Sequence, residues 1–160
     1  MYLYVISFVA GFGHGLRTAQ QRRKVMVRLL AGMFLVLHGL VHLLYFGQSQ
    51  RLLELQTGMV WPEGSWAFSQ LLGGEATRLL AGASCVLAAI GFVAGGIGML
   101  ASQRWWRAVV VGAAILSAAV FVLCWDGAWQ NLDGKGAFAI LINAAIVAAV
   151  LILQSPGSEV

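Results

Sequence analysis

The sequence predicts an all-α integral membrane protein, a bundle of four membrane-spanning helices in one domain. Hydrophobic residues make up 60% of the 160 residues and charged residues only 10%, against roughly 25% charged residues in soluble domains. Four apolar runs each approach the ~20 residues that cross a hydrocarbon core of ~30 Å. The tryptophans lie between these runs or at their ends, where amphipathic rings prefer the headgroup layer.

The predicted spans follow from the flanks of the four apolar runs. They cover about Val25–Phe46, Leu79–Leu100, Trp105–Trp125 and Gly136–Leu153. Together they form a transmembrane domain over residues 25–154, and residues 155–160 form a short C-terminal tail. The chain has no length left for a second domain.

The basic residues predict the orientation of the bundle. Three lie on one side of the predicted spans, namely Arg51, Arg78 and Lys135. Seven lie on the other side, namely Arg17, Arg22, Arg23, Lys24, Arg28, Arg104 and Arg107. The positive-inside rule therefore places both termini in the cytoplasm. An anionic lipid surface accepts the basic cluster, so the expected partner is the lipid bilayer and not a nucleic acid.

Residues 1–24 are predicted to form a basic N-terminal segment that lies in the membrane interface. The apolar part of this segment is too short to span, and Gly11, Gly13 and Gly15 interrupt it. Its positive charges follow the apolar part, whereas a signal peptide has them first. A translation start at Met26 is the alternative, because a complete first span begins there.

The connection between the first two spans, residues 47–77, is predicted to carry two short amphipathic helices on the outer face. The first covers residues 48–56, where three leucines lie among polar residues. In the second, Ser65 caps a helix that Gly73 and Gly74 end. Such helices anchor a loop at the membrane surface or cover a site below it.

Small residues four positions apart predict close packing between the spans, because this spacing lets helix backbones touch in lipid. The pairs are Gly91 with Gly95, Ala94 with Gly98, Ala114 with Ala118, and Ala144 with Ala148. Gly95 is therefore expected to face a neighbouring helix.

The strongest chemical clue is a pair of histidines in the first span, His38 and His42. Ionisable groups at membrane depth are costly and tend to face a partner, a cavity or a ligand. Counting 1.5 Å per residue from the outer ends places His38 and Asn143 at similar depths of ~10 to 12 Å, which predicts a hydrogen bond between them. We predict an outer-leaflet ligand site formed by His38, His42, Tyr45, Arg78 and Asn143.

Three interpretations of the histidine pair remain open. Each neutral imidazole can be satisfied by Asn143, a hydroxyl group or a backbone carbonyl. Alternatively, the pair lines a proton-linked or small-molecule pocket. In the third interpretation the pair shares a metal ion with further candidate ligands, the full set being His38, His42, Cys85 and Asp126. Cys85 and Cys124 lie apart in predicted depth and are interpreted as core residues.

Several motifs carry a resemblance to known proteins. They are His-Gly-Leu-Val-His at residues 38–42, Gly-Phe-Val-Ala-Gly at 91–95, Gly-Ala-Phe-Ala-Ile-Leu-Ile-Asn at 136–143, Arg78, and the pairs Trp105–Trp106 and Trp125–Asp126. The chain resembles, over about residues 26–153, a group of small four-helix bacterial membrane proteins of uncharacterised function. This resemblance implies that the chain is a multi-pass protein of a bacterial inner membrane. In number and size of spans it is also similar to DoxX-like proteins, some of which are linked to redox or thiol-handling membrane complexes. This second likeness is an analogy of fold only.

These observations predict a non-enzymatic membrane subunit or a small-molecule-binding bundle that needs no cofactor. No nucleophile lies beside a base, so no catalytic residue is predicted. The alternative is a metal- or quinone-dependent redox component of the same membrane. The expected protein partners are other membrane subunits or a second copy of the chain.

Overall fold

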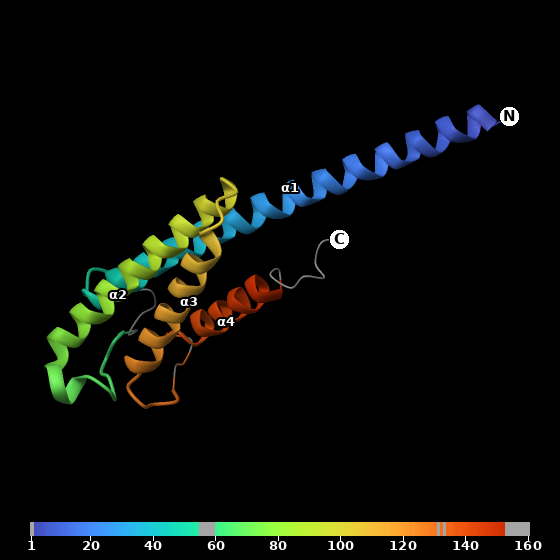
Figure 1. Cartoon of the computed structure of the whole chain (residues 1–160). Helices are drawn as coiled ribbons and strands as arrows, with labels where there is room; N and C mark the ends of the chain where they lie inside the picture. The colour runs from blue at the N-terminus through green and yellow to red at the C-terminus, as the bar shows by residue number, and fades with distance from the viewer. Residues whose placement is uncertain (1, 55–59, 131, 133, 153–160) are drawn as a thin grey trace.

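The computed structural model consists of four α-helices, and the residues that it describes, 2–54, 60–130, 132 and 134–152, contain no β-strand (Figure 1). The helices are α1 (Tyr2–Ser49), α2 (Ser69–Leu100), α3 (Trp106–Leu123) and α4 (Ala137–Ile152). This arrangement confirms the all-α fold class and the order of the four apolar segments.

Three of the helices are long and apolar enough to cross a membrane, namely Gln20–Ser49 within α1, all of α2, and all of α3. α4 is apolar but has 16 residues, which at 1.5 Å per residue is ~24 Å. It begins directly after Gly136, whose φ of 91° turns the chain. The predicted end of this span at Leu153 falls outside the described residues.

The outward faces of the helices are apolar. Large side chains are exposed there that a water-soluble protein would bury, such as Leu37, Leu87, Ile115 and Phe138. Each of the four helices contributes one of these residues. Hydrocarbon is the solvent in which such a surface is stable.

Consecutive helices pack side by side: α1 on α2, α2 on α3, and α3 on α4. Glycines make the first two contacts close. A Cβ atom on Gly96 of α2 would lie 2.8 Å from the carbonyl oxygen of Gly32 in α1. A Cβ atom on Gly95 would collide with Val110 Cγ2 of α3. The expectation that Gly95 faces a neighbouring helix is therefore confirmed.

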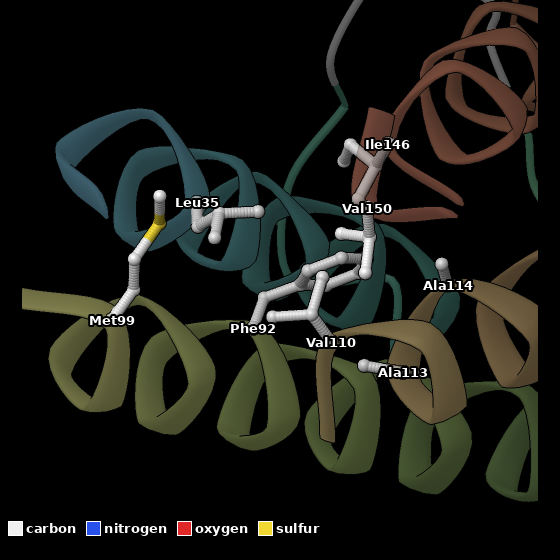
Figure 2. Close-up of a cluster of buried hydrophobic side chains, with 8 residues drawn as sticks. All are labelled: Leu35, Phe92, Met99, Val110, Ala113, Ala114, Ile146 and Val150. Carbon is white, nitrogen blue, oxygen red and sulfur yellow. The ribbon is translucent and has the colours of Figure 1, made fainter. Parts of the chain in front are cut away.

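All four helices contribute to an apolar cluster in which Phe92 and Val110 are fully buried (Figure 2). Figure 2 shows the α4 side chains Ile146 and Val150 approaching from the side opposite α2. The complete cluster is Leu35, Phe92, Met99, Val110, Ala113, Ala114, Ile146 and Val150. It holds α4 against the other helices.

α1 is longer than the predicted first span. It runs for 48 residues without a break from Tyr2 through the basic cluster to Ser49, and its first part extends beyond the other helices (Figure 1). The predicted division after residue 24 therefore coincides with no break in the helix. The interfacial location of this segment stays a prediction.

The loop between α1 and α2 differs from the prediction of two separate helices. In the described part of the first piece, α1 continues to Ser49 and the chain then turns, while residues 55–59 lie outside the described residues. In the second piece Ser65 does act as a cap, because its Oγ accepts the N–H groups of Ala67 and Phe68. The helical turn that follows is joined to α2, since the helix resumes directly after Gly73, whose φ of 75° interrupts it.

Candidate functional site

His38 and His42 lie one helical turn apart on the buried face of α1. Only 7% and 2% of their surfaces are exposed. Phe92 of α2 contacts both imidazoles, with ring centroids 4.7 Å from His38 and 5.2 Å from His42. The predicted stripe of α1 therefore faces the interior of the bundle.

A ring of four hydrogen bonds joins the two histidines to α3 and α4. His38 Nε2 lies 2.9 Å from Asn143 Oδ1, and Asn143 Nδ2 donates to Ser117 Oγ at 2.8 Å. Ser117 Oγ lies 2.7 Å from His42 Nε2. His42 Nδ1 closes the ring at 2.9 Å from the backbone carbonyl oxygen of His38. The predicted bond between His38 and Asn143 is confirmed.

The partners fix the position of each proton in this ring. A carbonyl oxygen only accepts, so His42 Nδ1 carries the proton that it donates to His38 O. The Nε2 of a neutral His42 then accepts the hydroxyl proton of Ser117. His38 Nε2 donates to Asn143 Oδ1, which is also only an acceptor. With both imidazoles neutral, every bond has one donor and one acceptor.

Aromatic side chains surround the ring of hydrogen bonds. Phe34 stacks on His38 with ring centroids 5.9 Å apart and an interplanar angle of 12°. Phe121 of α3 approaches His42 from the outer side, at 6.4 Å. The polar groups are thus enclosed by apolar surface, where an unsatisfied donor or acceptor costs free energy.

The other two predicted ligand residues do not belong to this ring. Tyr45 is buried one turn further out, in edge-to-face contact with Trp61 and Phe121. Arg78 lies at the start of the long α2 segment, beside a polar hollow of about 290 Å³ that Arg51 also lines. Counting residues from the outer end of each span gives the depth of a side chain in the membrane, and this depth placed both residues near the histidines. It gives no information on which face of the bundle they occupy.

The candidate metal ligands are not brought together. Within the described residues, no group of three or more His, Cys, Asp and Glu side chains could hold a metal ion. Asp126 instead forms an ion pair with Lys135, with 2.7 Å between Nζ and Oδ2. Cys85 and Cys124 are free thiols in one buried cluster with Trp61, so they are closer neighbours than their predicted depths suggested.

The sequence places Ser117 on one face of the third span, among the polar groups that could converge in the outer half of the bundle, but it does not predict the bonds of Ser117 to His42 and Asn143. Phe92 was missed as a part of the site. Ser117 is the one hydroxyl residue of α3, and a lone polar residue in an apolar helix is a signal for an interior hydrogen bond. Phe92 carries no such signal, because apolar residues occur all around α2.

No family model, no curated protein and no solved structure matches the chain.

Proposed function

We propose that this chain is a non-enzymatic membrane protein in which the ring of His38, His42, Ser117 and Asn143 locks the helices together. The closed hydrogen-bond ring is the observation that carries this proposal. Side by side, α1 packs on α2, whereas α3 and α4 come later in the packing order. The ring connects α1 directly to these two helices by hydrogen bonds. Hydrogen bonds between membrane helices contribute about 0.6 to 2 kcal/mol each. Such a bundle suits a subunit of a larger membrane assembly.

We also propose that α4 is the fourth span and that both termini are cytoplasmic, in a bacterial inner membrane. Arg28 of α1 hydrogen-bonds to Ser102 after α2. The basic part of α1 and the basic turn between α2 and α3 therefore lie at the same end of the bundle. This supports one cytoplasmic face under the positive-inside rule. A span of ~24 Å is accommodated by modest local thinning of the bilayer.

A second candidate function is binding of an apolar small molecule, and one observation favours it. A groove of about 310 Å³ lies between α1 and α4 and is lined by Phe34, which stacks on His38. A quinone-like ring is the kind of ligand that this position suits, since the groove is apolar and a polar side chain lies directly behind Phe34. The apolar groove beside His38 thus supports a quinone-dependent redox component as the alternative function.

Purification of the full chain in detergent separates these functions. Parent, His38→Gln and His42→Gln are compared by optical spectrum, metal content and organic extraction, with thermal unfolding measured in parallel. The structural lock predicts no stoichiometric chromophore or metal in the parent and a lower melting temperature in both variants. A stoichiometric quinone that is lost from His38→Gln with unchanged melting would establish the ligand site instead.

A further inference from the structure

A large basic hollow of about 1230 Å³ lies at the inner end of the bundle, far from the histidine ring. α1 and the segment around the start of α3 both contribute to it. Its cationic residues are Arg23, Lys24, Arg28, Arg104 and Arg107. The hollow therefore combines five positive charges from two parts of the chain that are distant in sequence.

No carboxylate neutralises these charges within the part of the chain that the structure describes. Its ion pair, Lys135 with Asp126, involves neither this hollow nor its residues. Arg28 Nη1 donates to Ser102 Oγ, while Arg28 Nε is buried and has no hydrogen-bond partner among the described residues. Arginine groups arranged in this way suit an anion with several oxygens, and phosphate is the common one.

The apolar groove between α1 and α4 adjoins this hollow. Met99 and Trp106 line both of them. From there the groove runs along α4 from Val150 to Ile142, a distance of ~12 Å at 1.5 Å per residue. The combined surface is basic at the membrane boundary and apolar toward the bilayer centre.

We propose that this surface binds one anionic phospholipid, with its phosphate beside Arg28 and Arg104 and an acyl chain in the groove between α1 and α4. The inference rests on the membrane location given under the proposed function, but not on the histidine ring. Charge complementarity selects the occupant: a zwitterionic headgroup would add an ammonium group to a cluster of cations. A free phosphate would leave the apolar groove unused.

Native mass spectrometry of the detergent-purified full chain tests this proposal. The probes are phosphatidylglycerol, phosphatidylcholine with the same acyl chains, and inorganic phosphate. We expect phosphatidylglycerol to bind as a single adduct, roughly tenfold or more tighter than phosphatidylcholine, because several basic residues contribute. Inorganic phosphate in the same concentration range should not displace it.

Two pairs of variants locate the headgroup and the chain. Arg28→Gln with Arg104→Gln should weaken phosphatidylglycerol binding roughly 25-fold, on the order of fivefold for each cation removed. Arg22→Gln is the matched control, because Arg22 lies on α1 beside a different hollow. Ala149→Trp should fill the groove and weaken binding, whereas Ala148→Trp, exposed on α4 but outside the groove, should not. Thermal unfolding verifies that each variant is folded.

The proposal is overturned if Arg22→Gln weakens binding as much as the double variant, since attraction would then come from the whole basic face. Unchanged phosphatidylglycerol binding in Ala149→Trp would show that the acyl chain does not occupy the groove. Displacement by inorganic phosphate would show that the site binds anions in general and not a phospholipid. None of these variants touches the histidine ring, so a failure here is distinguishable from a failure of the structural lock. The quinone-like ligand of the second candidate function would occupy the same groove, and organic extraction of the parent separates it from a phospholipid.

Discussion

One oxygen atom holds the polar ring together. Ser117 Oγ donates its proton to His42 and accepts one from Asn143, so two buried side chains depend on it. All three residues have no more than 2% of their surface exposed. The loss of this atom therefore leaves two polar groups without partners, in surroundings that water does not reach.

Ser117→Ala should lower the free energy of unfolding by about 1 to 3 kcal/mol, because buried groups left without a partner pay their desolvation cost. Ser117→Thr keeps the hydroxyl group and serves as the control. Thermal or denaturant unfolding in detergent measures the difference. Equal stability of the Ala and Thr variants would contradict the ring as a stabilising element.

A double-mutant cycle on His38 and Asn143 should give a coupling energy of about 0.6 to 2 kcal/mol, the range for hydrogen bonds between membrane helices. His38→Ala, Asn143→Ala and the double variant supply the three comparisons with the parent. Leu37→Ala with Asn143→Ala is the control cycle, because Leu37 is exposed on the outer face of α1. Additive effects in the His38 cycle would show that the bond stabilises nothing.

Between elements, the α2–α3 interface depends on the absence of a side chain at Gly95. Gly95→Leu should destabilise the bundle by roughly 1 to 3 kcal/mol, since the added atoms overlap Val110. Gly112→Leu on α3 is the matched control, because a Cβ atom there meets no neighbour within 4 Å. Melting temperatures in detergent distinguish them. A Gly95→Leu protein that melts like Gly112→Leu would disprove this interface.

The turn between α3 and α4 is held by the ion pair of Asp126 and Lys135. Partial burial raises the pKa of Asp126. The hydrogen bonds from Lys135 and from the backbone N–H of Ala128, together with the charge of Lys135, outweigh this effect, so the pKa lies below its ordinary value. A carboxylate with a lowered pKa contributes stability above its unfolded pKa of about 3.9, and this contribution is lost as pH falls through the folded value.

The melting temperature of the parent should therefore fall faster than that of Asp126→Asn when the pH is lowered from about 6 to about 3. The amide introduced by this substitution cannot ionise, so the variant lacks the contribution of the carboxylate at every pH. Parallel curves for the two proteins would mean that the ion pair does not stabilise the turn.

At the scale of the whole molecule, the two ends differ in charge, and the orientation follows from this difference. A reporter that is active only in the cytoplasm should be active when fused to the C-terminus and silent when inserted after Gly127 in the α3–α4 turn. Activity measured in stably inserted fusions checks the topology. The reverse pattern would invert the bundle, and activity at both positions would remove α4 as a span.

The sequence was sufficient for those parts of the fold that depend on length and hydrophobicity. Depth alone predicted the bond between His38 and Asn143, and four-residue spacing predicted the contact at Gly95. Rotation of each helix about its axis is set by packing, which the nearly uniform apolar composition of α2 and α3 does not encode. This is why the bonds of Ser117 were not predicted and why Arg78 was expected beside the histidines, whereas it lines a different hollow.

The direction of the ring has a consequence for charge movement across the membrane. The four bonds all run the same way, from His38 through Asn143 and Ser117 to His42 and back to the His38 carbonyl. A proton wire must be able to reverse its polarity after each transfer, so that the next proton can follow. The carbonyl oxygen has no proton to return and the amide of Asn143 does not readily give one up. The ring is therefore no proton wire, because its own bonds cannot carry a net transfer of protons.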